Sequence, residues 1–174
     1  MKVLNWMLLG LVAVAVGCNN ASPTAQSGGT NMSVDGTSQF TLSVEPADAM
    51  PVGAARESVQ NDDSVTLVGT IGGSMKPFVD GLVAFTIVDP KVPYCSGDDT
   101  CPTPWDYCCT QDQVKENIAT VKFVDQEGNL VEGDARKLLN VSELSTVVVQ
   151  GKAKRDEQGN LTVTANKIFV RSGA

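Results

Sequence analysis

The chain has 174 residues, a net charge of −7 and no histidine. This acidic balance disfavours nucleic-acid binding and contact with anionic lipid, because both depend on Lys and Arg next to phosphates. The absence of histidine removes the commonest metal ligand and general base, and with it every Ser-His or Cys-His nucleophile pair. We therefore expect a non-enzymatic protein without a cofactor, and not a conventional hydrolase.

The first 18 residues have the pattern of an export signal. Lys2 provides a minimal positive end, and the apolar run from Val3 to Val16 is shorter than the ~20 residues of a membrane span. The run ends in Ala15-Val16-Gly17-Cys18, a small residue directly before a cysteine. This ending resembles the lipobox of bacterial lipoproteins, although leucine is usual where Ala15 stands.

The lipobox resemblance implies that Cys18 is lipidated and becomes the mature N-terminus, so that residues 1–18 are signal peptide and lipobox. The alternative is a secreted protein cleaved nearby, which leaves Cys18 unexplained because the next cysteine is Cys95. Asn19 replaces the aspartate that would suggest inner-membrane retention. We expect a lipid-anchored protein of the cell envelope that faces the periplasm or the exterior, with the outer membrane favoured.

Residues 19–61 are rich in Ser, Thr, Gly, Pro, Ala and Asn. Such a segment buries too little apolar surface to offset the entropy of ordering it, so it is predicted to be a flexible tether. Within it, Gln39 to Val44 alternates apolar and polar residues. That short stretch is predicted to be either an extra strand or a segment that docks along the domain.

The remaining residues, 62–174, form the predicted folded domain, in which strands alternate apolar and polar side chains. The predicted inward residues of the five strands are, in order, Val65, Leu67, Gly69 and Ile71; Val83, Phe85 and Ile87; Ala119, Val121 and Phe123; Val147, Val149, Gly151 and Ala153; and those of Leu161 to Val170. Asp134 is expected to cap one short helix from Ala135 to Leu144. Turns are expected at 125–129 and 156–160, and a slip of the alternation between Ala165 and Ile168 predicts a bulge.

Three strands, a helix and two further strands, with a glycine inside the first strand, resemble the OB-fold, a five-stranded Greek-key barrel. The resemblance covers Asp63 to Arg171, and most of it rests on Val148 to Asn166. It implies an all-β barrel with one helix, or else a small barrel or sandwich of another kind. Because OB-folds have many functions, the resemblance does not decide this one.

Between the second and third strands lies a predicted insertion, residues 90–117, that carries four of the five cysteines. Its segment Thr103-Pro-Trp-Asp-Tyr-Cys-Cys109 also resembles a motif of uncharacterised secreted lipoproteins of planctomycete-type bacteria. That resemblance implies a layout of anchor, tether and domain, and no particular activity. Loops of this length are usually functional or cross-linked.

The first interpretation of Cys95, Cys101, Cys108 and Cys109 is two disulfides, since an exported domain with an even cysteine count favours oxidation. The adjacent pair Cys108 and Cys109 would need a strained ring, so bridges from Cys95 and Cys101 to this doublet are expected.

The alternatives are a thiolate site for zinc or copper(I), and thiol redox chemistry. Nearby aspartates would attract a cation; they are Asp98, Asp99, Asp106 and Asp112. The spacing has no Cys-x-x-Cys pair, which weakens both alternatives.

Aromatic residues near the cysteines are candidates for a binding surface. Trp105 and Tyr107 belong to the insertion, and Phe78 lies in the loop after the first strand. Trp105 and Tyr107 either cover the cross-links and pack on the barrel edge or, with Trp105 exposed, form an interface that Phe78 could join. The sequence thus predicts an envelope lipoprotein presenting a disulfide-stapled OB-like binding or structural module for an unknown partner or small ligand, with a thiolate metal-binding protein as the alternative.

Overall fold

The structure is a computed structural model that describes residues 39–95 and 101–172. The predicted signal peptide, Cys18 and residues 19–38 of the predicted tether lie outside these residues. Within the described ranges, no helix is long and apolar enough to cross a membrane.

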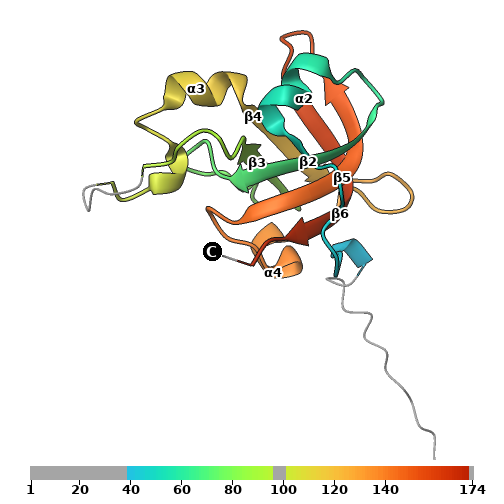
Figure 1. Cartoon of the computed structure of the whole chain (residues 1–174). Helices are drawn as coiled ribbons and strands as arrows, with labels where there is room; N and C mark the ends of the chain where they lie inside the picture. The colour runs from blue at the N-terminus through green and yellow to red at the C-terminus, as the bar shows by residue number, and fades with distance from the viewer. Residues whose placement is uncertain (1–38, 96–100, 173–174) are drawn as a thin grey trace, which may run out of the picture. The chain divides into compact units, whose positions relative to one another are not determined.

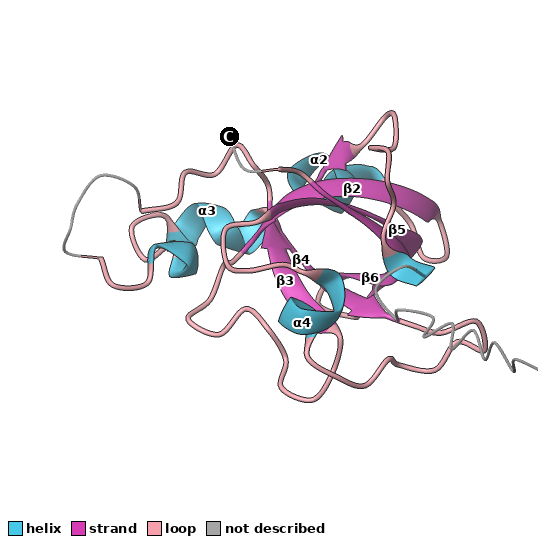
Figure 2. Ribbon diagram, turned by 90° about the horizontal axis from the view of Figure 1, so that it is seen from below, coloured by secondary structure: helices cyan, strands magenta, loops and turns pink. Residues whose placement is uncertain are grey.

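Five strands close into a barrel (Figures 1 and 2). The strands are β2 (Ser64–Ile71), β3 (Ala84–Val88), β4 (Ile118–Phe123), β5 (Thr146–Arg155) and β6 (Leu161–Val170). Their order is β2-β3-β4-β6-β5, and β5 pairs with β2 to complete the ring. The β4–β6 pair is parallel and the other neighbours in the ring are antiparallel. This order is the Greek-key order of an OB-fold, as the sequence predicts.

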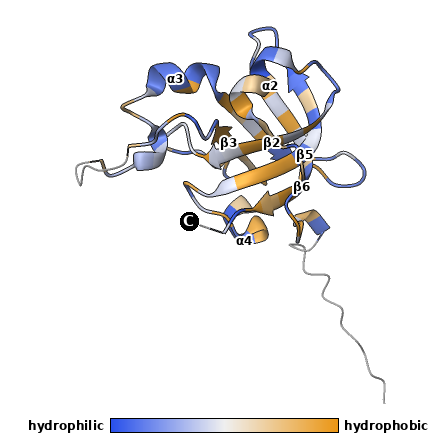
Figure 3. Ribbon diagram, viewed as in Figure 1, coloured by the Kyte–Doolittle hydropathy of each residue, from blue (hydrophilic) through white to orange (hydrophobic). Residues whose placement is uncertain are grey.

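The barrel interior is filled by the alternating apolar side chains of the five strands. Phe85 and Phe123 are fully buried, with ring centroids 6.2 Å apart. Figure 3 shows apolar colouring along the strands and hydrophilic colouring on the connecting loops and on α3 (Gln111–Glu116). Burial of the predicted inward faces is the main stabilising term of the fold, since each large apolar side chain contributes about 1.5–3 kcal/mol.

The predicted bulge lies in β6. Lys167 pairs with Gln150 and Ala165 with Gly151, so Asn166 is the extra residue. A side chain on Gly151 would collide with the Thr164 carbonyl oxygen, which explains a glycine opposite the bulge. The bulge restores inward orientation to Ile168 after the slip in the alternation.

The domain begins well before residue 62, so the predicted boundary of the tether is wrong. Strand β1 (Met50–Pro51) pairs in parallel with β2, and helix α2 (Val52–Ser58) buries Val52 and Ala55 in the barrel core. The buried carboxylate of Asp89 accepts a hydrogen bond from Gly53 N (2.7 Å) in the first turn of α2. The composition is misleading here because the contacts that order this seven-residue helix come from distant residues: Asp89 at its first turn, and Arg155, whose guanidinium donates to Ala55 O (3.2 Å) and Arg56 O at its end.

Residues Gln39 to Val44 dock on the barrel through a single β-bridge. The sequence predicts either a strand or a docking segment here. Thr41 is bridged in parallel to Ile168, and Leu42 N donates to Ile168 O (2.7 Å). Phe40 is buried with its ring 5.4 Å from that of Phe123. One large apolar contact therefore attaches the segment without a regular strand.

The helix after β4 is shorter than predicted. Helix α4 runs from Ala135 to Leu139, with Asp134 accepting from Arg136 N (3.0 Å) as the expected N-cap. It ends because Asn140 adopts a left-handed conformation, φ 52°. Two further elements lie in the insertion: the 3-10 helix η1 (Pro104–Asp106) and α3.

Candidate functional site

The cysteine insertion packs against the barrel through a small second core. Tyr107 is fully buried and lies with Val88, Val92 and Val114 in a cluster separate from the barrel interior. Gly73 N donates to Trp105 O (2.8 Å), which joins the insertion to the loop after β2. Figure 1 shows α3 projecting on one side of the barrel. The insertion is thus held on the barrel surface by packing rather than by a strand.

The four cysteines of the insertion meet at its outer side. Cys95 Sγ lies 3.2 Å from Cys109 Sγ and 3.3 Å from Cys108 Sγ. Cys108 Sγ lies 3.7 Å from Cys101 Sγ and 3.8 Å from Cys109 Sγ. All four are free thiols, and none of these pairs is at the bonding distance of about 2.05 Å. We call this group the thiol cluster.

The Asp106 carboxylate lies beside the thiol cluster and hydrogen-bonds to the chain around it. Its Oδ2 accepts from Thr103 Oγ1 (2.8 Å) and its Oδ1 from Cys108 N (2.8 Å). These bonds keep the pKa of Asp106 below its ordinary value, chiefly through Thr103. A carboxylate oxygen of Asp106 and the sulfurs of Cys95, Cys101 and Cys108 lie within 4.8 Å of one another. The sequence identifies Asp106 only as one of four nearby negative charges, because its proximity to the sulfurs depends on the 3-10 turn.

The thiols of the cluster differ in acidity. Hydrogen bonds from the Cys109 backbone and side chain, and from the Cys108 side chain, lower the pKa of Cys95 to about 7. The same contact with Cys95, together with the Cys101 thiol, raises the pKa of Cys108 well above its ordinary range. Cys95 is therefore the thiol that ionises most readily among Cys95, Cys108 and Cys109.

The three aromatic candidates do not form one exposed surface. Phe78 is 7% exposed, packs on Phe85 and lies under the guanidinium of Arg136, 3.9 Å from the ring centroid. Tyr107 is buried in the second core, and only Trp105 is half-buried, with Nε1 donating to Met75 O (3.3 Å). Both Phe78 and Tyr107 are buried, so neither ring is available as a binding surface, and the burial of Tyr107 agrees with its packing interpretation. Asp98 and Asp99 lie outside the described residues.

The fold and the site define an all-β OB-fold protein with a surface thiol cluster. No family model matches the sequence, and no curated protein matches it either. The chain is similar to the structure of the hypothetical protein YgiW from E. coli at 16% identity, covering 76% of this chain and 96% of the other, with a TM-score of 0.36. It is also similar to the mitochondrial single-stranded DNA binding protein Rim1 from S. cerevisiae at 14% identity, covering 66% and 100%, with a TM-score of 0.37.

Proposed function

We propose that this protein is a lipid-anchored binding module of the cell envelope whose thiol cluster holds a soft metal ion, zinc(II) or copper(I). The carrying observation is the clustering of four cysteine sulfurs, each within 3.2 to 3.8 Å of at least one other, on the insertion. Thiolates are the preferred ligands of both ions. Nucleic acid is not part of the proposal, because the net charge of −7 opposes it.

The spacing of the sulfurs fits such an ion. In a tetrahedral site with metal–sulfur bonds of about 2.3 Å, neighbouring sulfurs lie about 3.8 Å apart. The Cys101–Cys108 and Cys108–Cys109 distances, 3.7 and 3.8 Å, agree with this value. The two distances to Cys95 are about 0.5 Å shorter and would widen when a metal ion replaces the shared protons. Cys95, Cys101 and Cys108 supply three ligands, and Cys109 or the Asp106 carboxylate supplies the fourth.

The insertion supplies rigidity for this site. Thr110 Oγ1 donates to Pro93 O (2.9 Å), and Gln111 Nε2 donates to Asp106 O. The first bond joins the chain before Cys95 to the chain after Cys109, and the second holds α3 against η1. The sulfurs are half-buried or exposed, so an ion could exchange with the surroundings. This accessibility supports metal uptake or delivery over a purely structural role.

A second candidate function is the disulfide-stapled module. One arrangement of two bridges needs only short movements, since Cys95 is 3.2 Å from Cys109 while Cys101 is 3.7 Å from Cys108. Both bridges join an early cysteine to the doublet. An oxidising compartment favours this state. The two candidates therefore predict opposite numbers of free thiols.

The proposed envelope location rests on the apolar run and on Cys18, for which no other role is evident. The proposal predicts diacylglyceryl on Cys18 and loss of residues 1–17, and intact-mass measurement of membrane-extracted protein tests this. A mature soluble species that begins elsewhere would contradict the anchor. Loss of the anchor would leave the metal proposal standing, since the two depend on different residues.

The metal proposal is tested by counting thiols and metal ions in protein purified without reductant or chelator. We expect four alkylatable thiols after metal removal and one zinc or copper ion per chain before it. Cys108→Ser should lower the metal content to near zero, because Cys108 contacts the other three sulfurs. Cys18→Ser is the matched control and should keep the ion. Two disulfides without metal would establish the second candidate, and four free thiols that bind neither ion would reject both.

A further inference from the structure

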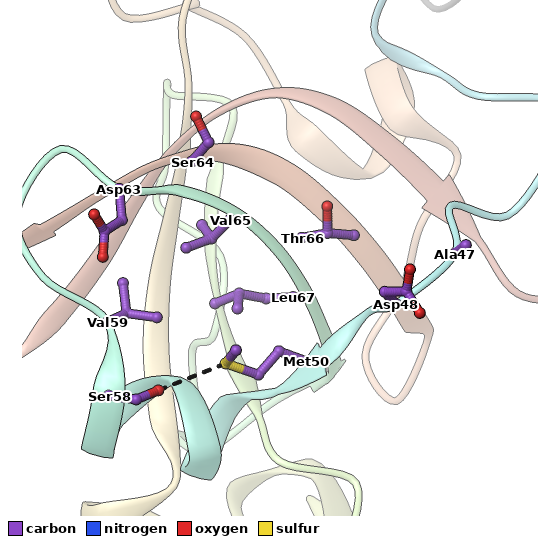
Figure 4. Close-up of a pocket in the computed structure, with 10 residues that line it drawn as sticks. All are labelled: Ala47, Asp48, Met50, Ser58, Val59, Asp63, Ser64, Val65, Thr66 and Leu67. Carbon is purple, nitrogen blue, oxygen red and sulfur yellow. Dashed lines mark hydrogen bonds between the residues drawn. The ribbon is translucent and has the colours of Figure 1, made fainter.

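A groove of about 500 Å³ lies between β2 and the β1–α2 segment, a site separate from the thiol cluster. Its floor is apolar and consists of Val59, Val65 and Leu67. Met50 and Ser58 form one wall, with Ser58 Oγ 3.9 Å from Met50 Sδ. In Figure 4 these side chains lie between two carboxylates, Asp63 at one end and Asp48 at the other.

One edge of β2 is unpaired in this groove. Within the described residues, β1 pairs with β2 only at Leu67 and Val68, and β3 pairs with it only at Thr70 and Ile71. Residues 64–66 pair on their other side, with β5. Backbone groups of an antiparallel strand alternate between the two edges. Because Ile71 N donates to Ser145 O (2.9 Å) across the β5 edge, the backbone groups of Ser64 and Thr66 are directed away from β5. The parallel register of Met50 with Leu67 uses the Thr66 carbonyl for Met50 N–H, since Pro51 has no N–H, so the open groups are those of Ser64 and the N–H of Thr66.

The edge is open because the chain before β1 turns away from it. A continued β1 would place residues 47–49 beside Ser64–Thr66 in the parallel register of Met50 with Leu67. Asp48 instead adopts a left-handed conformation, φ 58°, which ends the pairing. The turn leaves a space of about three residues along β2. An extended chain entering this space would continue the sheet that β1 begins.

The ends of the groove are acidic. Asp48 and Asp63 are exposed, and neither forms an ion pair within the described residues. Asp63 Oδ2 accepts a hydrogen bond from Gln60 N, with 2.8 Å between the two atoms, and this bond fixes the carboxylate at the groove. Lys152 contacts Ser64 Oγ (2.8 Å) but does not line the groove. The charges at the two ends, and the net charge of the chain, are complementary to a cationic partner.

We propose that this groove binds an extended segment of a partner protein as an added β-strand. The segment has apolar side chains toward Val59 and Val65 and a Lys or Arg near each end. Backbone hydrogen bonds to the N–H and C=O of Ser64 and to the N–H of Thr66 supply the affinity, and the two carboxylates supply the preference for basic residues. The site thus recognises a short basic, β-forming peptide.

Two capped peptides test the proposal on the full chain by NMR titration: Lys-Val-Thr-Val-Lys as the probe and Glu-Val-Thr-Val-Glu as its charge-reversed control. We expect amide shifts at Ser64, Thr66 and Met50 with the first peptide, slower exchange of the Thr66 amide hydrogen, and no such changes with the second. Asp48→Asn together with Asp63→Asn should weaken binding about threefold to tenfold at low salt, as expected for two exposed ion pairs. Asp80→Asn removes one exposed charge elsewhere and should leave affinity unchanged.

Three results would overturn the proposal. The first is the absence of shifts at Ser64–Thr66 at millimolar peptide. The second is equal binding of both peptides. The third is a set of concentration-dependent shifts at these residues without peptide, which would show that a second copy of the chain fills the groove.

Discussion

At the scale of single residues, Tyr107 is the side chain that connects the cysteine insertion to the barrel. It has a left-handed backbone conformation, φ 56°, directly before the Cys108–Cys109 doublet, so its turn orients both thiols. Its ring is fully buried, and burial raises the pKa of its hydroxyl to about 12. That hydroxyl makes no hydrogen bond of ordinary geometry within the described residues, although the Thr70 side chain is close enough to lower its pKa slightly.

Tyr107→Phe should raise the free energy of unfolding by up to about 1 kcal/mol, because it removes a buried polar group that lacks a good partner. Tyr107→Ala should lower it by about 3–5 kcal/mol through the cavity that it leaves. Urea unfolding followed by circular dichroism measures both changes. A clear loss of stability in Tyr107→Phe would mean that Thr70 is a true hydrogen-bond partner.

Asp125 and Asp156 begin the two predicted turns, and each accepts backbone N–H bonds from residues two and four positions later. Asn160 bonds lower the pKa of Asp156 below its ordinary value of 3.8. Because the pKa of Asp156 is lower in the folded state, its hydrogen bonds stabilise the fold fully at a pH above the unfolded-state pKa. This stabilisation is lost as the pH falls through the folded-state pKa. We therefore expect the Asn160 amide to lose its bonded NMR shift only below pH 3.8; loss of the shift at higher pH would contradict this.

At the scale of the element, docking of the insertion depends on two glycines at the end of β2. A β-carbon on Gly72 would lie 2.6 Å from Trp105 O and 2.8 Å from Tyr107 Cε2. Gly73 adopts φ 91° and donates to Trp105 O. A residue without a side chain lets the backbone of the insertion contact the backbone of the loop directly.

Gly72→Ala should displace the insertion and destabilise the protein by about 1–3 kcal/mol, the usual cost of an overpacked contact. Hydrogen exchange at the Gly73 amide should accelerate because its bond to Trp105 O is lost. Ser74→Ala, two residues further along the same loop, is the control and should exchange as the parent does. Unchanged protection of Gly73 in Gly72→Ala would show that the insertion is held elsewhere.

At the scale of the whole molecule, the residues that the structure describes form two apolar cores of unequal size. The barrel core includes Phe85 and receives side chains from all five strands of the barrel, whereas the second core consists of Val88, Val92, Tyr107 and Val114. The thiol cluster adjoins the second core, since Cys108 directly follows Tyr107. Its chemical state should therefore affect the insertion and leave the barrel folded.

Phe85→Ala should lower the free energy of unfolding by about 3–5 kcal/mol, because its ring is fully buried. Cys95→Ser combined with Cys108→Ser should change the free energy of unfolding of the barrel by no more than about 0.5 kcal/mol. Amide hydrogen exchange should stay slow in the strands and become faster in α3. The same holds for reduction or chelation of the parent. Global unfolding of the double variant at neutral pH would show that barrel and insertion form one cooperative unit.

The OB-fold could be predicted from the sequence because its signals are local. Alternation of Val65 and Leu67, the turns at Asp125 and Asp156, and the slip after Ala165 each reflect neighbouring residues on one chain segment. The N-cap at Asp134 is of the same kind. Such patterns determine which face of a strand is buried before any partner strand is known.

Only the tertiary structure decided three features: helix α2, the packing of Phe78 and Tyr107, and the groove beside β2. The cap of α2 comes from Asp89, 36 residues away, and no local pattern carries that contact. The composition of residues 39–61 was therefore misread as a tether. Likewise, the sequence showed that four cysteines share one insertion, but their meeting at 3.2 to 3.8 Å depends on the turn at Tyr107 and on docking against Gly72. Distances between side chains far apart in sequence arise from packing, which composition and periodicity do not encode.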